Sequence, residues 1–312
     1  MLGLLIHTSI LFLLTLSAMT TNTSSTNLPP WLTLPATPSL PTPNSSAHAP
    51  INNISLWHAL YGPPLTENTI PIILLHGGKI SSRWYGHLIP SLSTTFPVIA
   101  IDTRAHGRSS DDPSVDLSYA LFAQDTIALM DYLGIRQARF VGWSDGANTA
   151  LQITMDHPER VDRVFVYGAN YSPDNVNLPG LQGISFGADL VDRERSQYEE
   201  LKRDVGLQAG GQADWEGFVA RVEAMQAGEP RWTGEDFGRI PVLYEVGDGD
   251  APVVLVAAGD HEEAILPHVP GRIHGMIANS QLAILPGMSH FGPLQDPEMF
   301  AAVVTAFMSR PR

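Results

Sequence analysis

Residues 142–146 read Gly-Trp-Ser-Asp-Gly, a pattern that can expose one serine hydroxyl for chemistry. They follow the apolar run 138–141 and precede a stretch with helical spacing from Ala147 to Met155. A strand, a sharp turn and a helix around G-x-S-x-G hold the serine at the tip of the turn. A serine hydroxyl is a weak nucleophile until a base takes its proton. Ser144 is therefore the predicted nucleophile, and its partners must come from elsewhere in the chain.

The predicted base is His290, one of 11 histidines. It follows the last expected strand, 282–285, and precedes a terminal helix that begins near Pro297. The ordinary pKa of histidine suits proton transfer near neutral pH. His76, by contrast, is expected to brace its own loop.

The acid that orients the histidine is expected in the loop after the apolar run 253–258. That loop contains Gly259 and three carboxylates, Asp260, Glu262 and Glu263. A carboxylate at this position can accept the Nδ1–H of the imidazole, fix its tautomer and stabilise the imidazolium. The residue types alone leave all three acids open.

A glycine turn after the expected strand 70–75 is the candidate oxyanion site. The chain continues there with His76, Gly77 and Gly78. Acyl transfer needs N–H donors aimed at the developing oxyanion. We expect the backbone N–H groups of Gly78 and Asp145 to supply them.

The elements that must position these residues alternate between strands and helices. A helix is expected over 118–133, with Gly134 as its C-terminal stop. Near-continuous apolar strands between amphipathic helices predict a doubly wound, mostly parallel α/β sheet. The expected strands are 70–75, 98–101, 138–141, 164–167, 253–257 and 282–285, with an antiparallel lead-in strand at 54–61.

This alternation stops between residues 171 and 246, which we interpret as an inserted helical cap. Trp215 and Met225 belong to an apolar stripe at helical spacing. The stripe is expected to pack the cap onto the main domain, with Trp215 or Met225 as alternative substrate-lining residues. The charged residues between 193 and 203 are expected on a solvated helix face.

Six segments together resemble the α/β-hydrolase family. The chain is similar there to the biphenyl-hydrolase-like and valacyclovir-cleaving serine esterases. The resemblance implies a serine hydrolase that cleaves a carboxylic ester through an acyl-enzyme, with nucleophile, acid and base in that chain order. It leaves the substrate open. The resembling segments are 72–78, 102–109, 142–146, 157–161, the loop after Gly259, and 289–291.

Two positions depart from the family pattern. Relatives carry an aspartate three residues after the loop glycine, where this chain has Glu262. The resemblance thus favours Glu262 as the acid, with Asp260 as the alternative and Glu263 third. Ala105 replaces a usual glycine, a minor change if its φ is negative.

Asp145 has a second predicted role, in substrate binding. Its side chain is expected near the acyl pocket, where an isolated carboxylate is costly to desolvate. An ammonium group on the substrate would offset that cost, as in the amino-acyl-ester hydrolases that this turn resembles. The alternative is that nearby backbone N–H groups or basic side chains of the main domain satisfy it.

The N-terminal segment predicts export. Residues 1–20 resemble a cleaved signal peptide, with an uncleaved membrane anchor as the alternative. Residues 21–50 are rich in Ser, Thr, Asn and Pro and are expected to form a disordered stalk before the folded domain, 51–312. Sequons begin at Asn22, Asn44 and Asn53, and Pro173 disfavours a fourth at Asn170.

Composition narrows the remaining possibilities. The chain has no cysteine and a net charge of −14, which argues against thiolate chemistry and against nucleic acid as a partner. We expect no cofactor and no metal, and a small-molecule ester as the substrate of a secreted enzyme. The oligomeric state stays open. Perhydrolysis, C–C hydrolysis, amide cleavage and a catalytically inactive binding protein are the alternative functions.

Overall fold

The computed structural model describes residues 28–206, 214–242 and 251–310. Its centre is an eight-stranded sheet in the order β1-β2-β4-β3-β5-β6-β7-β8. β1 pairs with β2 and β2 with β4 in antiparallel fashion, and every other pairing is parallel. The strands are β1 (Ser45–Ile51), β2 (Ile54–Tyr61), β3 (Ile72–Leu75), β4 (Val98–Ile101), β5 (Ala138–Trp143), β6 (Val161–Tyr167), β7 (Val253–Gly259) and β8 (Gln281–Leu285).

Every strand expected from the sequence is present, so the doubly wound, mostly parallel sheet is confirmed. The largest shift of a boundary is in β6, which begins at Val161, three residues before the expected start. β3 begins two residues late, at Ile72. Pro71 precedes it and has no N–H to donate to a neighbouring strand. Its carbonyl instead accepts a hydrogen bond from Arg139 N of β5 at 2.8 Å.

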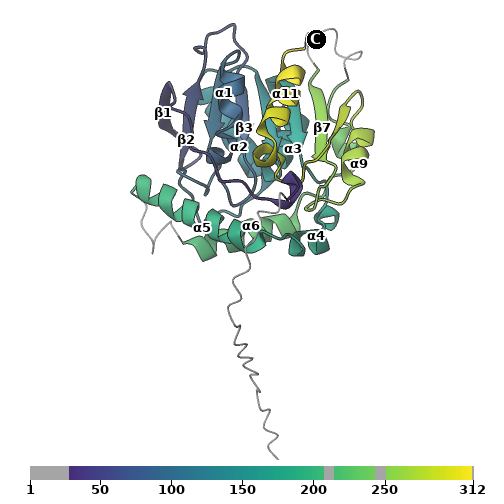
Figure 1. Cartoon of the computed structure of the whole chain (residues 1–312). Coiled ribbons are helices and arrows are strands. Elements are labelled where there is room, and N and C mark those ends of the chain that lie inside the picture. The colour runs from purple at the N-terminus through teal and green to yellow at the C-terminus, as the bar shows by residue number, and fades with distance from the viewer. Residues whose placement is uncertain (1–27, 207–213, 243–250, 311–312) are drawn as a thin grey trace, which may run out of the picture.

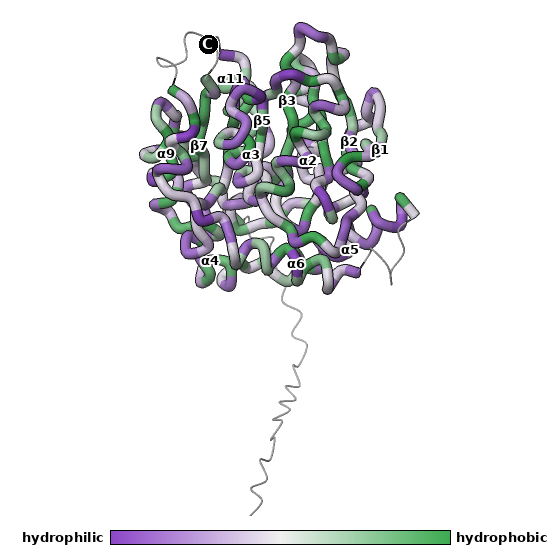
Figure 2. The backbone as a smooth tube through the Cα atoms, turned by 180° about the vertical axis from the view of Figure 1, so that it is seen from behind, coloured by the Kyte–Doolittle hydropathy of each residue, from purple (hydrophilic) through white to green (hydrophobic). Residues whose placement is uncertain are grey.

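Helices cover both faces of the sheet (Figure 1). One face carries α1 (Leu88–Ser93) and α11 (Pro297–Met308), and the other carries α2 (Tyr119–Tyr132), α3 (Asp145–Asp156) and α9 (Val269–Met276). Hydrophobic residues run along the central strands, and hydrophilic residues are frequent in the surrounding helices (Figure 2). Two apolar layers therefore enclose the sheet, one on each face.

The ends of α2 follow the local sequence. The Ser118 side chain accepts a hydrogen bond from Leu121 N at 3.0 Å and so caps the first turn. Gly134 has a φ of +70° just past the last turn, a conformation that glycine adopts without strain. Both predicted ends of this helix are confirmed to within a residue.

Between β6 and β7, helices gather at one end of the sheet (Figure 1). They form the cap. The described cap helices are α4 (Leu178–Gln182), α5 (Gly187–Asp204), α6 (Trp215–Gly228) and α7 (Gly234–Phe237), with the 3₁₀ turn η4 (Pro173–Asn175) ahead of them. Short elements elsewhere are η1 (Pro30–Leu32), η2 (Ser82–Tyr85), η3 (Pro158–Arg160) and α10 (Gly292–Gln295). Across the described ranges, no helix combines the length and the apolarity that crossing a bilayer requires.

The expected disordered stalk, 21–50, is wrong over its described part. Residues 45–51 form β1, and residues 28–44 lie along the molecule as an extended segment that we call the N-terminal strap. Leu34 and Leu40 of the strap pack against the apolar core, and its backbone carbonyls find partners on the folded domain. Arg193 Nη2 of α5 donates to Leu34 O at 3.2 Å, and Gln295 Nε2 of α10 donates to Thr33 O at 2.9 Å.

The predicted signal peptide and the first sequon, at Asn22, lie outside the described residues. Asn44 and Asn53 are exposed, so their side chains are accessible. Asn170 is 7 % exposed, and its side chain bonds Asn148, which leaves no room for a glycan.

Candidate active site

Ser144 occupies the sharp turn between β5 and α3. Its φ of +57° and ψ of −122° are strained for a residue with a side chain. Two glycines make the turn possible, because a Cβ at position 146 would collide with the Leu75 carbonyl and one at position 142 would collide with the backbone at Gly146. The backbone thus places the serine at the carboxyl edge of the sheet, as expected from the pentapeptide.

Of the two expected oxyanion donors, Asp145 directly follows the serine and Gly78 lies against the Asp145 side chain. Gly77 lies against the serine, since a Cβ there would be 3.2 Å from Ser144 Cβ. Asp145 N begins α3, where an N–H has no partner within its own helix. Gly78 is held to glycine because any Cβ would meet the Asp145 carboxylate and would lie 2.7 Å from Gln226 Nε2.

His290 and Glu262 are in direct contact. His290 Nδ1 lies 2.8 Å from Glu262 Oε1, and both residues are buried. The same carboxylate oxygen accepts hydrogen bonds from Ala264 N at 3.0 Å and Ile265 N at 3.1 Å. These backbone donors fix the carboxylate, and the carboxylate in turn fixes the imidazole.

The two other acids of this loop, Asp260 and Glu263, accept hydrogen bonds from backbone N–H groups and do not bond the His290 imidazole. Asp260 accepts a bond from Met288 N at 3.3 Å, and its side chain is 40 % exposed. Glu263 Oε2 accepts the backbone N–H of His290 at 2.8 Å. Glu262 is therefore the carboxylate that the geometry pairs with the imidazole, and Glu263 holds the backbone behind it.

The loop that carries His290 is tied down by groups that the sequence did not single out. Trp143 Nε1 donates to His290 O at 2.8 Å, and Tyr167 Oη donates to Ser289 O at 2.6 Å. Gln295 Oε1 accepts from Ser289 N at 3.0 Å. Trp143 and Tyr167 end neighbouring strands, so the sheet itself sets the height of the base above Ser144.

Gly168 was also missed by sequence reasoning. It follows β6 with a φ of +66°, and a Cβ there would lie 2.7 Å from His290 Cε1 and 3.5 Å from Glu262 Oε2. The position of a glycine directly after a strand that neighbours the elbow strand could have drawn attention to it.

Charge and burial act in opposite directions on the base. Burial alone would lower the pKa of His290, but the carboxylates of Glu262 and Glu263 raise it above the ordinary histidine value of 6.5. With a proton on Nδ1 donated to Glu262, Nε2 is the ring nitrogen left to act as a base.

Ser144 and His290 open into one cavity of about 630 Å³ between the sheet edge and the cap. A volume of this size is typical of small-molecule sites. Most of the lining is apolar, including Ile80, Trp143, Val176, Leu178, Leu181, Leu190, Ala264, Ile265 and Phe291.

The Asp145 side chain also lines this cavity. Its carboxylate accepts hydrogen bonds from Tyr119 Oη at 2.8 Å and from Gln226 Nε2 of the cap at 2.9 Å. Burial raises the pKa of Asp145. The partners are a hydroxyl and an amide, rather than the backbone N–H groups or basic side chains expected for a structural role.

The expected substrate contact at Trp215 is wrong. The ring packs against Tyr198 and Phe218, with centroids 5.5 and 5.7 Å apart, inside the cluster that joins the cap to α2. Met225 belongs to the same cluster. α6 turns Glu223, Gln226 and Ala227 toward the cavity instead.

The expectation of a solvated charged face on α5 also fails at two positions. Glu194 and Lys202 are 7 % and 1 % exposed and lie on the buried face with Tyr198 and Leu201. Lys202 Nζ donates to Ser109 O at 2.5 Å, which anchors the cap to the loop 102–109.

That loop braces the core. The buried Asp102 carboxylate accepts bonds from Ser82 N at 2.9 Å and from the Arg108 side chain at 2.8 Å. Ala105 has a φ of +68°, so its replacement of the usual glycine is not the minor change that a negative φ would have made it. Its N–H donates to Ser110 O at 3.1 Å, and such surroundings hold the strained conformation.

The family model described as the alpha/beta hydrolase family matches residues 72–303. The chain belongs to this family. A putative carbamate hydrolase of Caulobacter vibrioides is 30% identical over 272 residues, which cover 81% of this chain and 95% of that protein. A pimeloyl-[acyl-carrier protein] methyl ester esterase of Neisseria meningitidis serogroup B is 27% identical over 246 residues, 76% of this chain and 92% of that protein.

Solved structures share the alpha/beta hydrolase fold. The enol-lactonase of Burkholderia xenovorans aligns with a TM-score of 0.63 at 23% identity, covering 84% of this chain and 100% of that one. A meta-cleavage product hydrolase of Pseudomonas fluorescens aligns with a TM-score of 0.63 at 21% identity, covering 85% and 97%. The similar proteins with assigned names are mainly hydrolases and esterases, which supports hydrolysis as the general reaction.

Proposed function

We propose that this alpha/beta hydrolase is a serine esterase that cleaves a small carboxylic ester through an acyl-enzyme. The observation that carries the proposal is the contact of His290 Nδ1 with Glu262 Oε1, at 2.8 Å, beside the strained Ser144 turn and on the same cavity. A nucleophile, a base and an orienting acid are the groups that acyl transfer requires.

In the first half of the reaction, Ser144 Oγ attacks the ester carbonyl while His290 Nε2 takes its proton. Glu262 stabilises the imidazolium that forms. The N–H groups of Gly78 and Asp145 donate to the tetrahedral oxyanion. His290 then protonates the leaving alcohol, which departs and leaves the acyl group on the serine.

In the second half, a water molecule gives its proton to His290 Nε2 and attacks the acyl-enzyme carbonyl. The oxyanion returns to the same two donors. Collapse of this intermediate releases the carboxylic acid, and the imidazolium returns its proton to Ser144 Oγ. The mechanism needs no group beyond water and the side chains of this chain.

The cavity supports an ester with an apolar portion. Its apolar walls would bury an alkyl or aryl chain, and the buried area would supply binding energy. Among similar proteins, one is named a methyl ester esterase and another an enol-lactonase, and both names describe the cleavage of a carboxylic ester bond.

Labelling with a fluorophosphonate probe tests the proposal. The wild-type protein is expected to gain one probe adduct on Ser144, located by peptide mass spectrometry. Ser144→Ala is expected to lose both labelling and hydrolysis of a panel of esters by several orders of magnitude. Circular dichroism and thermal unfolding of Ser144→Ala check that the fold is retained. An unlabelled wild type, or a labelled Ser144→Ala with ester activity, would contradict the proposal.

A further inference from the structure

Glu194 differs from the other carboxylates of the catalytic cavity because it is buried and has no bonded partner among the residues that the structure describes. Glu194 comes from α5, is 7 % exposed, and lines the cavity that Ser144 and His290 share. Within the described residues, its side chain makes neither a hydrogen bond nor an ion pair. Burying a carboxylate in this way is costly. Burial raises the pKa of Glu194 to about 7.

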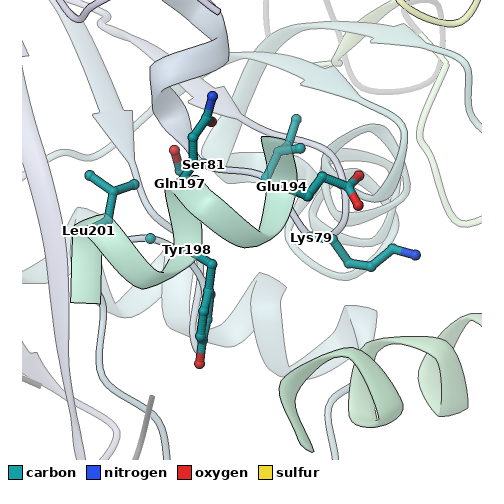
Figure 3. Close-up of a pocket in the computed structure, with 8 residues that line it drawn as sticks. Lys79, Ser81, Glu194, Gln197, Tyr198 and Leu201 are labelled. Atoms are coloured by element: carbon teal, nitrogen blue, oxygen red, sulfur yellow. The ribbon is translucent and has the colours of Figure 1, made fainter. Parts of the chain in front are cut away.

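The hollows around Glu194 determine from which side a ligand can reach it. A recess of about 10 Å³ lies behind it, between α5 and the residues that follow β3 (Figure 3). A recess of that size holds about one water molecule and no substrate group. In Figure 3 the Glu194 carboxylate and the Lys79 side chain extend to the same side, away from Leu201. A partner for Glu194 must therefore enter through the catalytic cavity.

The other charged groups around the cavity are occupied or exposed. Asp145 already accepts two hydrogen bonds. Lys79 Nζ lies 3.3 Å from Glu223 Oε1, and the Glu223 side chain is 59 % exposed. Asp174 is exposed. The charged residues of the lining are therefore mainly acidic. Besides His290, they are one lysine, Lys79, and four carboxylates, Asp145, Asp174, Glu194 and Glu223.

We propose that Glu194 is a specificity-determining residue that binds a primary ammonium group carried by the ester substrate. The inference rests on the proposed esterase function, because the ammonium group is placed in the cavity while Ser144 attacks the ester carbonyl. The ammonium group supplies three N–H donors and a positive charge in contact with the carboxylate, whereas Lys79 influences that carboxylate without forming an ion pair with it. The apolar walls between Glu194 and Ser144 then contact the chain that links the two functional groups.

A comparison of matched esters tests the inference. The substrates are a series of ω-amino methyl esters of increasing chain length, each paired with the methyl ester in which a methyl group replaces the ammonium. We expect kcat/KM to be about 10- to 100-fold higher for the ammonium member at the best chain length. Glu194→Gln is expected to remove this preference while hydrolysis of the neutral esters continues.

The pH dependence of this preference provides a second readout. The ratio of the two kcat/KM values cancels the titration of His290, which both substrates share. It is expected to rise through about pH 7 as Glu194 ionises, since the substrate ammonium stays protonated until about pH 10. A ratio that stays flat or falls across this range would show that ionised Glu194 does not hold the ammonium group, and would overturn the inference.

Two further variants separate Glu194 from its surroundings. Asp192→Asn makes the same change of charge on the exposed side of α5 and is expected to keep the preference. Asp145→Asn tests the other buried carboxylate of the cavity. If the preference is lost in Asp145→Asn and survives in Glu194→Gln, the ammonium site belongs to Asp145 and the inference is wrong.

Binding of an ammonium compound that is not an ester tests the role of Glu194 without relying on catalysis. Hexylammonium is titrated into the wild type and into Glu194→Gln by calorimetry in buffers of different ionisation enthalpy. Below pH 7, binding to the wild type is expected to release a proton, because the cation favours ionised Glu194. Weaker binding by about ten-fold or more is expected in Glu194→Gln. Equal affinity in both proteins overturns the inference, whereas an absence of ester hydrolysis and of probe labelling overturns only the proposed function.

Discussion

Gly168 lies directly against the imidazole of His290, so that a Cβ at position 168 would be 2.7 Å from His290 Cε1 and 2.8 Å from Nδ1. The imidazole can occupy this position because residue 168, just after the end of β6, carries no side chain. A single methyl group there would have to displace either the ring or the backbone after β6.

Gly168→Ala is therefore expected to lower kcat/KM for ester hydrolysis by about 100-fold, the cost of misplacing a catalytic group by about 1 Å. Steady-state kinetics and thermal unfolding are the measurements. Gly134→Ala is the matched control, because its φ is +70° and nothing lies within 4 Å of the added Cβ. Both variants carry the backbone strain, about 1 kcal/mol or more, but only Gly168→Ala is expected to lose activity. Equal activity in the two would contradict a steric role for Gly168.

Glu262→Gln is expected to lower kcat by about 10⁴-fold, because an amide favours the wrong tautomer and leaves the imidazolium without its counter-charge. Asp260→Asn is expected to stay close to wild type, since that carboxylate contacts Met288 N and not the ring. The comparison is made in kcat with each variant's fold checked by circular dichroism. A larger loss in Asp260→Asn would transfer the orienting role to Asp260.

Glu263→Gln is expected to move the acid limb of the kcat/KM profile to lower pH. Activity needs neutral His290, so kcat/KM rises with pH through the pKa of this residue. Glu263 helps to raise that pKa above 6.5, and removing its charge lowers it. Glutamine keeps an oxygen that can accept the His290 N–H, so the plateau at high pH should change little. A limb that stays in place would show that Glu263 acts only through its hydrogen bond.

Lys202→Met probes the anchor between the cap and the loop 102–109. Burial lowers the pKa of Lys202 from 10.5 to about 8, so between these values the unfolded chain binds more protons and wild-type stability rises with pH. The variant lacks this group. The free energy of unfolding of the wild type minus that of the variant should grow by up to about 1.4 kcal/mol per pH unit in this window. Urea unfolding at several pH values measures it, and a constant difference would argue against a buried, shifted lysine.

Trp31→Ala tests the N-terminal strap. Trp31 stacks on His261, with ring centroids 4.0 Å apart and planes within 3°, directly beside Glu262. Loss of the stack is expected to lower stability by about 1 kcal/mol and Tm by about 2–4 °C, with a fall in kcat smaller than in Gly168→Ala. Leu32→Ala is the control, since Leu32 is 45% exposed on the same strap. If both variants match the wild type, the strap does not support the acid loop.

The positions of Ser144 and His290 on one cavity could be predicted because their sequence signals are local. A glycine-flanked serine between a strand and a helix has few conformations, and His290 follows the last strand directly. The choice of acid could not be fixed in the same way. Asp260 and Glu262 are two residues apart, and what separates them is where the N–H groups of residues 264 and 265 lie. That information belongs to the folded loop.

Two other failures have different causes. Residues 28–44 have a composition that suits disorder, yet they are held by side chains more than 150 positions away, such as Arg193. No local pattern records such a partner. Glu194 and Lys202 were assigned to solvent because they are charged, although with Tyr198 and Leu201 they follow the helical spacing of a buried face. The helical spacing, and not the charge of the side chains, indicates which residues of α5 are buried.

The strap also constrains how the enzyme can admit its substrate. Leu34 is bonded to the cap through Arg193, and Trp31 rests on the acid loop through His261. Three residues of chain reach at most about 10 Å. A cap that lifts away from the sheet at α5 must either break the Arg193 contact or pull on the loop that orients the base. A movement of the cap at α5 would therefore be transmitted through the strap to the loop that carries Glu262.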